Sequence, residues 1–161
     1  MRLRPLTVDD EAAARQAHNE LEADDFSFLL GHDPTEPWAV YVHRLRQYAR
    51  GLDLPADLVP AAFLVADVGG DVVGRVSIRY QLNDSLRRLG GHIGYGVRPG
   101  FRRRGYATEI LRQSLVVARA QGVGRALLTC DDANAGSART IERCGGRLLE
   151  TEAGTRRYWI D

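Results

Sequence analysis

The chain has 161 residues, of which 44% are hydrophobic and 27% are charged, and its formal net charge is +1. This length suits one domain that hides about 70% of its unfolded surface, and the composition excludes a disordered, collagen-like or membrane-spanning chain. The small net charge argues against a general affinity for nucleic acid. The N-terminal residues lack the apolar stretch of a secretory signal, and two cysteines, Cys130 and Cys144, build no disulfide framework. These features predict a cytoplasmic location.

The N-terminal half is expected to contain two helices and three strands. Apolar residues at 38, 41, 42 and 45 follow a helical period, and Gly69-Gly70-Asp71 is typical of a hairpin turn. The expected elements are a strand over Arg2–Leu6, a helix capped by Thr7 that ends near Ala23, a helix over Trp38–Arg50, and strands over Ala61–Val68 and Val72–Tyr80.

The C-terminal half is expected to alternate strands and helices after an irregular segment at Gln81–Gly90. The expected elements are strands over Gly91–Val97 and Arg125–Cys130, helices over Arg103–Gln121 and Asn134–Cys144, and a closing hairpin of Arg147–Thr151 with Thr155–Ile160. The order β-α-α-β-β-β-α-β-α-β-β, without repeats or linkers, predicts a single α/β domain over residues 1–161 with a mixed sheet.

Positive charge is concentrated where a strand leads into the longest predicted helix. Four arginines lie within seven residues there, namely Arg98, Arg102, Arg103 and Arg104, and Gly105 follows them. The first turn of a helix has unpaired N–H groups at the positive end of its dipole, and a glycine lets a ligand approach the backbone. The segment therefore predicts a cradle for a diphosphate. It is not the lysine-containing phosphate loop, because the chain contains no lysine.

The run Arg102-Arg103-Arg104-Gly105-Tyr106-Ala107 resembles the R/Q-x-x-G-x-G/A signature of the GNAT superfamily of N-acetyltransferases. The stretch from Asn134 to Gly145 is similar to that family's N-x-x-S/A-x-x-x-x-E-x-x-G helix. The resemblance is strongest over residues 72–146. Some features are similar to uncharacterised acetyltransferases, and Ile93-Gly94-Tyr95 resembles the ribosomal-protein acetyltransferase branch.

The resemblance implies a mixed, mostly antiparallel sheet in which a central pair of parallel strands, 91–97 and 125–130, splays apart. Acetyl-CoA would lie in the gap as the co-substrate, with the N–H of Val97 directed at the thioester carbonyl. The residues implied to bind acetyl-CoA are Val97, Arg102, Arg103, Arg104, Gly105, Tyr106, Ala107, Thr108, Asn134 and Ser137.

The implied reaction is direct transfer of the acetyl group to a primary amine in a ternary complex. His92 is the candidate general base, because imidazole titrates near neutral pH, although a histidine with a purely structural role is the alternative. The tyrosine that often supplies the proton in this family is replaced by Ile141, so Ser137 or a water is expected to serve instead. Asn134 would contact the pantetheine arm, although capping of its helix accounts for it equally well.

The acceptor is expected from the face opposite acetyl-CoA, in a pocket lined by Trp38, Tyr41 and Tyr80. Acidic residues, including Asp24 and Glu36, would make its entrance attractive to a cationic amine, either a small molecule or an amine of a protein or peptide. No metal site is expected, because Asp131-Asp132 lacks further ligands at a suitable spacing. A non-catalytic module that binds acyl-CoA is the alternative function, and a homodimer is possible.

Overall fold

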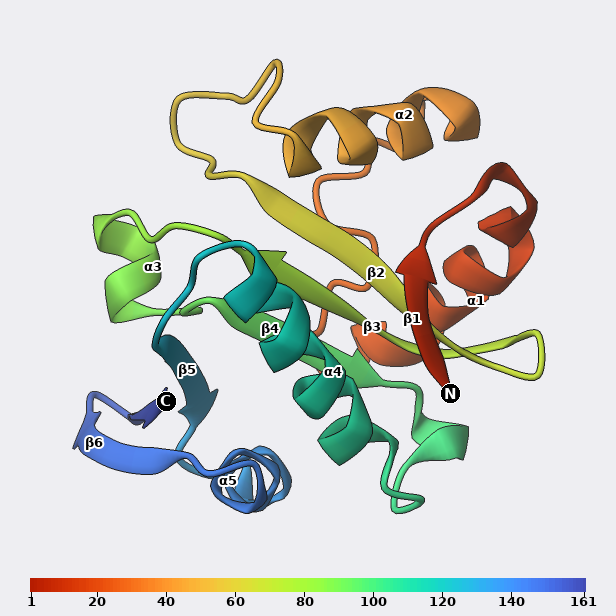
Figure 1. Ribbon diagram of the computed structural model, residues 1–161. Helices are drawn as coiled ribbons and strands as arrows, with labels where there is room; N and C mark the ends of the chain where they lie inside the picture. Colours follow the sequence, from red (N-terminus) through yellow and green to blue (C-terminus); the bar gives the residue numbers. More distant parts are fainter.

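The computed structural model describes residues 1–161, whose strands form two antiparallel sheets (Figure 1). The first sheet has the order β1-β2-β3-β4, and the second has the order β5-β7-β6. The strands of the first sheet are β1 (Arg2–Pro5), β2 (Ala61–Val68), β3 (Asp71–Arg79) and β4 (Ile93–Val97). Those of the second are β5 (Ala126–Asp131), β6 (Arg147–Glu152) and β7 (Thr155–Ile160).

The helices cover both faces of the first sheet (Figure 1). One face carries α1 (Glu11–Glu22) and α2 (Trp38–Ala49), and the other carries α4 (Tyr106–Ala120), which packs on β3 and β4. Helix α5 (Ala135–Arg143) lies beside α4 and β5. The short elements are α3 (Asp84–Arg88) and two 3-10 turns, η1 (Val8–Asp10) and η2 (Pro99–Phe101).

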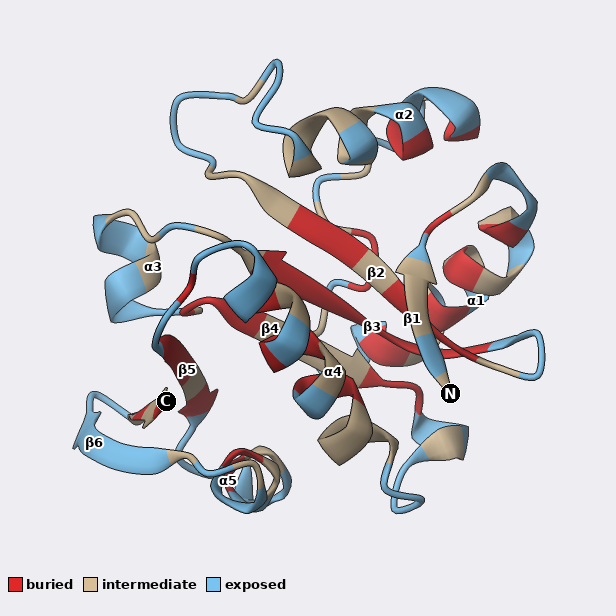
Figure 2. Ribbon diagram, in the orientation of Figure 1, coloured by how far each residue is buried: buried red, intermediate tan, exposed pale blue.

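Strand alternation sorts the apolar side chains into one core on each side of the first sheet. On β3, Val76 and Ile78 are buried in the core beneath α4, whereas on β2 Phe63 and Val65 are buried in the core beneath α1 and α2. Figure 2 shows the resulting band of buried residues along the central strands. Successive side chains of a strand point to opposite faces, so Arg75, Ser77 and Arg79, which alternate with Val76 and Ile78 on β3, point toward α1 and α2. This side of the sheet is called the α1/α2 face below.

The expected α/β fold class and the chain order of its main elements are confirmed. One difference is that β4 and β5 belong to separate antiparallel sheets rather than to one mixed sheet. A second is α3, which lies in the segment expected to be irregular, because the side chain of Asn83 caps it by accepting from the N–H of Leu86. A third is the start of α4 at Tyr106 rather than Arg103, because Gly105 has a left-handed φ of 83°.

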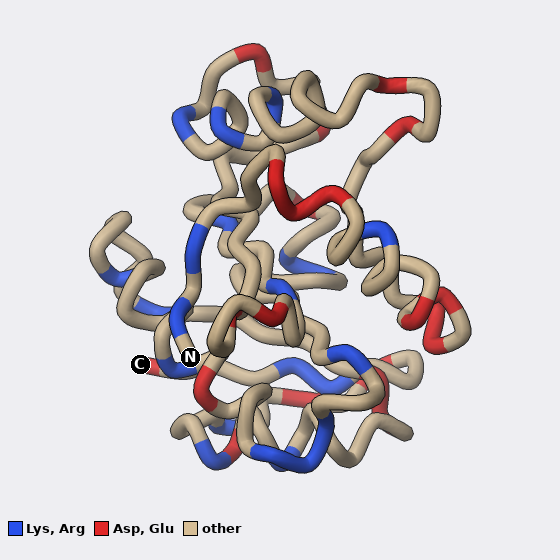
Figure 3. Tube along the Cα trace, turned by 90° about the vertical axis from the view of Figure 1, so that its right-hand side faces the viewer, with Lys and Arg blue, Asp and Glu red and all other residues tan.

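Ion pairs connect η1 and α1 to the first sheet. Arg4 on β1 bonds the carboxylates of Asp10 and Asp67, and Arg98 after β4 bonds Glu20 on α1. Positive and negative residues are interspersed along the chain trace (Figure 3). None of the helices has the length and apolar character needed to cross a membrane.

Candidate active site

The edges of the two sheets touch at one end and part beyond it. The N–H of His92 donates to the carbonyl of Leu127 at 2.7 Å, and the N–H of Leu127 donates to Nδ1 of His92 at 2.9 Å. A Cβ on Gly91 would lie 2.3 Å from the Leu127 oxygen, so only glycine permits this approach. We call this contact the β4–β5 junction. Beyond it no backbone hydrogen bond joins β4 to β5, which confirms the expected splay.

A cavity of about 250 Å³ lies between the parted strands. Its lining comes from β3, β4, β5, the start of α5 and the loop after α1. The residues are Phe26, Arg75, Arg79, Gly90, Ile93, Gly94, Tyr95, Thr129, Cys130, Asn134 and Ser137. We call it the gap cavity. It therefore includes Asn134 and Ser137 from the expected acetyl-CoA site, and it also includes residues of the α1/α2 face.

The backbone of β4 directs alternate N–H groups into this gap. The N–H of Arg98 donates to Val73 and that of Arg79 donates to His92, so the even-numbered residues of β4 bond β3. In an antiparallel pair the intervening residues point the other way. The N–H of Val97 consequently faces away from β3 toward the gap, as the sequence resemblance implies for a donor to a thioester carbonyl.

The turn that follows β4 presents a row of backbone N–H groups at the start of α4. The N–H groups of residues 103–108 donate to no backbone carbonyl, and Gly105 and Arg103 both have left-handed φ values, 83° and 62°. Nothing lies within 4 Å of a Cβ placed on Gly105. The turn is exposed and open to a ligand. These are the properties that bind phosphate at a helix N-terminus.

The arginines around this turn have different tasks. Arg98 is buried and bonds Glu20 and the carbonyl of Val72, so it holds the fold together. Arg102 bonds the carbonyl of Val97 and the carboxylate of Asp24. Arg103 and Arg104 are exposed, and Arg104 lies over the ring of Phe101. The exposed guanidinium groups of Arg103 and Arg104 are therefore the free cations beside the turn.

Helix α5 brings a hydroxyl pair to the gap cavity. The side chain of Asn134 caps α5 by accepting from the N–H of Ser137, as expected of a capping residue. The Ser137 Oγ lies 3.2 Å from the hydroxyl of Tyr95 on β4. Burial raises the pKa of Tyr95 to about 12, so its hydroxyl stays protonated at neutral pH. Ile141, which replaces the expected tyrosine, is completely buried.

His92 is buried at the β4–β5 junction, and its hydrogen bond argues against the expected role of general base. Its Nδ1 accepts from Leu127, so in the neutral ring the proton is on Nε2 and no lone pair is free. Burial and the nearby charge of Arg87 lower the pKa of His92, which favours this neutral form. The geometry instead suits a residue that holds β4 against β5.

The residues expected to line the acceptor pocket lie elsewhere. Trp38 and Tyr41 are buried in the core under α1 and α2, where the Trp38 Nε1 donates to the Thr7 carbonyl and the Tyr41 hydroxyl donates to the Leu30 carbonyl. Tyr80 is half-buried and packs against the other core. The acidic groups are also engaged, because Asp24 pairs with Arg102 and Glu36 pairs with Arg44. The helical spacing of Trp38 and Tyr41 indicated the core-facing side of α2. Sequence periodicity does not distinguish a side chain that faces the core from one that lines a pocket.

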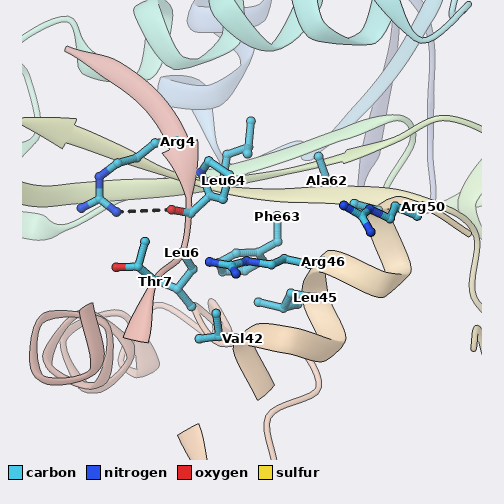
Figure 4. Close-up of a pocket in the computed structure, with 12 residues that line it drawn as sticks. Arg4, Leu6, Thr7, Val42, Leu45, Arg46, Arg50, Ala62, Phe63 and Leu64 are labelled. Atoms are coloured by element: carbon cyan, nitrogen blue, oxygen red, sulfur yellow. Dashed lines mark hydrogen bonds between the residues drawn. The ribbon is translucent and has the colours of Figure 1, made fainter. Parts of the chain in front are cut away.

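A larger cavity, of about 440 Å³, lies between α2 and the β1 and β2 strands (Figure 4). Its labelled side chains include the apolar Val42, Leu45 and Phe63, and the arginines Arg46 and Arg50. Neither the backbone N–H groups of β4 nor the α4 turn reaches it. This larger cavity is therefore separate from the chemistry described above.

The sequence reasoning assigned no role to several residues of the gap cavity, among them the polar Tyr95, Arg75 and Arg79. Tyr95 stood inside a quoted motif but was not assigned a role. Arg75 and Arg79 interrupt an otherwise apolar strand, and a charged residue within such a run was the available signal. No group of three or more potential metal ligands is present among the side chains.

The comparisons with known proteins agree with this geometry. A family model described as "Acetyltransferase (GNAT) domain" matches residues 1–147. An acetyltransferase from Agrobacterium tumefaciens is 22% identical, with a TM-score of 0.67 over 99% of this chain and 89% of that one. The comparison with curated proteins gave no match.

Two further solved structures are similar across nearly the full length of both chains. The yncA protein from Salmonella typhimurium, solved with its cofactor acetyl-CoA, is 16% identical, with a TM-score of 0.66 over 99% of this chain and 92% of that one. A ribosomal-protein-alanine N-acetyltransferase from Brucella melitensis is 17% identical, with a TM-score of 0.63 over 99% and 97%. At these identities the likeness is one of fold.

Proposed function

This chain belongs to the GNAT family of acetyltransferases, and on that premise we propose that it moves an acetyl group from acetyl-CoA to a primary amine by direct attack in a ternary complex. The observation that carries the proposal is the gap cavity, which begins where β4 parts from β5 and lies on the strand that leads into the α4 turn. A cytoplasmic location fits the two free cysteines.

The fit to acetyl-CoA rests on the open α4 turn. Its unpaired N–H groups from Arg103 to Thr108, with the exposed Arg103 and Arg104, would hold the pyrophosphate, and the parted edges of β4 and β5 would hold the pantetheine arm. Acetyl-CoA supplies the thioester carbonyl that the amine attacks.

Two groups of the chain would stabilise the transfer. The N–H of Val97 would donate to the carbonyl oxygen as negative charge develops on it. The Tyr95 hydroxyl, bonded to Ser137, would donate to the departing thiolate, which is a mild base with a pKa near 8.5. This pair takes the place of the tyrosine that is missing at Ile141.

The attacking amine must be neutral, and about one alkylamine in a thousand is neutral at pH 7. Since Nδ1 of His92 is engaged, the structure supplies no free imidazole lone pair at the junction. The reaction would draw on the neutral fraction of the amine, and its rate would rise with pH toward the pKa of the acceptor.

The buried Ile141 favours the alternative function, a module that binds acyl-CoA without turnover. Acetyl-CoA with a panel of primary amines separates the two functions. Release of free thiol supports the enzyme, and tight binding without thiol release supports the module.

The substitution Gly105→Glu tests the α4 turn. A side chain there strains a left-handed residue and puts a carboxylate in front of the N–H groups, so CoA binding should weaken by about a hundredfold or more in calorimetry, as expected when two charge-assisted hydrogen bonds are lost. Gly122→Glu is the matched control, because Gly122 has a φ of 86° and open surroundings just beyond the other end of α4. Equal CoA affinity in both variants would remove the turn from the binding site.

A further inference from the structure

Two arginines of β3 form a cationic wall of the gap cavity. Arg79 lies four residues after Arg75 on β3, so both side chains are on the same face of the strand, the α1/α2 face. Arg75 has 4% of its surface exposed, and Arg79 is half-buried. We call this pair the arginine wall. It lies on the side of the sheet opposite α4, where an acceptor would meet the gap.

Neither arginine has a carboxylate partner. Arg75 donates from Nη1 to the Gly94 carbonyl at 3.1 Å and from Nη2 to the Ser27 carbonyl at 2.6 Å, and its buried Nε has no hydrogen-bond partner. Arg79 donates from Nη1 to the carbonyls of Gly90 and Gly91. Both are absent from the ion pairs of the structure.

No carboxylate compensates this charge, since Glu20 on α1 and Asp24 just after it pair instead with Arg98 and Arg102. Burying a charge without a counter-ion is costly. Burial lowers the pKa of Arg75 to about 9, so it still carries its charge at neutral pH. A purely structural contact with backbone carbonyls could be made by a neutral side chain at a lower cost in desolvation.

Gly94 of β4 leaves the space beside the arginine wall free of a side chain. Gly94 is paired with Ser77, between the two arginines, and a Cβ on it would lie 3.6 Å from Nη1 of Arg79. The ring of Phe26 lies 4.2 Å from the Arg75 guanidinium and covers Gly96. The guanidinium groups thus border the same cavity as Tyr95 and Ser137.

Resting on the proposed acetyl transfer, we infer that the acceptor amine also carries an oxyanion, a carboxylate or a phosphate, which binds the arginine wall. The Arg75 guanidinium, which lines the cavity, and the Nε and Nη2 of Arg79, which make no hydrogen bond, suit such a group. A cavity of about 250 Å³ admits a small molecule or the end of a chain. This inference replaces the expectation of an acidic pocket that selects a purely cationic amine.

The first experiment uses the unaltered protein and matched acceptors. Each pair shares the amine and differs in the anion: phenylalanine with its amide, β-alanine with propylamine, and phosphoethanolamine with ethanolamine. Thiol release from acetyl-CoA should favour the anionic member by about tenfold or more in kcat/KM. The carboxylate and phosphate pairs identify which oxyanion is preferred. Equal or better use of the neutral members overturns the inference.

Calorimetric titration of the same pairs into the CoA-loaded protein separates this inference from the proposed reaction. Preferential binding of anionic members without thiol release supports the arginine wall and contradicts the transferase. Thiol release without preference supports the transferase and contradicts the arginine wall. Binding of neither member of any pair overturns the inference.

The variant Arg75→Gln provides the second test, with Arg46→Gln as the matched control in the larger cavity. Arg75→Gln should raise KM for anionic acceptors by about tenfold to a hundredfold and leave KM for neutral ones unchanged. An equal loss on both kinds of acceptor, with a lower melting temperature, would assign Arg75 a structural role. If Arg75→Gln does not fold, Arg79→Gln gives the same comparison from the more exposed arginine of the wall.

Discussion

Tyr95 on β4 places a hydroxyl in the gap cavity, and the residues on both sides of Tyr95 in the sequence are glycines. Gly94 and Gly96 point to the α1/α2 face, and Tyr95 points to the opposite side, where it meets Ser137 on α5 at 3.2 Å. A hydroxyl whose pKa is raised to about 12 by burial donates a hydrogen bond at every working pH. It is therefore suited to a leaving thiolate rather than to the amine proton.

We expect Tyr95→Phe to lower kcat by about tenfold or more, because the departing thiolate loses a donor. Ser137→Ala, which removes the other hydroxyl of the pair, should act in the same direction. CoA affinity, measured by calorimetry, should stay near that of the unaltered protein in Tyr95→Phe, since this hydroxyl does not belong to the α4 turn. A kcat unchanged in both variants would remove the pair from the reaction.

At the scale of elements, the β4–β5 junction determines where the two sheets part. His92 makes two hydrogen bonds across this junction, one through its backbone N–H and one through its Nδ1. Gly91 allows the close approach of the chain to Leu127. Because His92 is buried and accepts from a backbone N–H, we expect it to position the strand rather than to exchange protons with substrate.

The substitutions His92→Asn and His92→Gln test this role. An asparagine Oδ1 can occupy the place of Nδ1 and accept from Leu127, whereas the longer glutamine places its oxygen farther out. We expect His92→Gln to lower the free energy of unfolding by about 1–3 kcal/mol, the cost of leaving a buried N–H unpaired, and His92→Asn to lower it less, both measured by urea titration.

The pH dependence of the same variants separates positioning from base catalysis. The pKa of His92 is lowered in the fold by burial and by Arg87, so its contribution to stability is present above about pH 6.5 and is lost as pH falls through the folded value. His92→Asn should remove that part of the stability profile and leave the shape of the pH–rate profile intact. Loss of an ionisation from the pH–rate profile of His92→Asn would support His92 as the general base.

At the scale of the whole molecule, arginine–carboxylate pairs attach the α1/α2 layer to the first sheet and brace it internally. Arg4 lowers the pKa of Asp10 to about 2, Arg98 lowers the pKa of Glu20, and Arg44 lowers the pKa of Glu36. These pairs belong to β1 with η1, to the β4 end with α1, and to α2 with the loop before it. Protonation of these carboxylates at low pH should therefore weaken the attachment of the α1/α2 layer, which packs on the side of the sheet that carries the arginine wall.

We expect the free energy of unfolding to fall as pH falls from about 5 toward 2, because the unfolded carboxyls bind protons before the folded ones do. Asp10→Asn should flatten part of that decline, since its carboxyl no longer titrates, while lowering stability at pH 7. Urea unfolding at a series of pH values measures both effects. A decline as steep in Asp10→Asn as in the unaltered protein would show that this pair is not responsible.

The order of the main elements, the α4 turn and the cap of α5 could be predicted from the sequence alone. These features depend on local chemistry: Gly105 ends a loop in a left-handed conformation, four arginines cluster beside it, and Asn134 bonds the N–H of Ser137 three residues on. Such contacts are short in sequence, so residue type and spacing are enough to predict them.

Which side chains come together in the gap cavity depended on how the strands and layers pack. His92 was expected to be a base, but its Nδ1 is claimed by Leu127, 35 residues away, and Trp38 and Tyr41 were expected in a pocket but fill the core. Arg75 meets Ser27 across 48 residues and Tyr95 meets Ser137 across 42. Contacts of this range follow from how strands and layers pack, and helical or strand periodicity gives the face of an element without its neighbour.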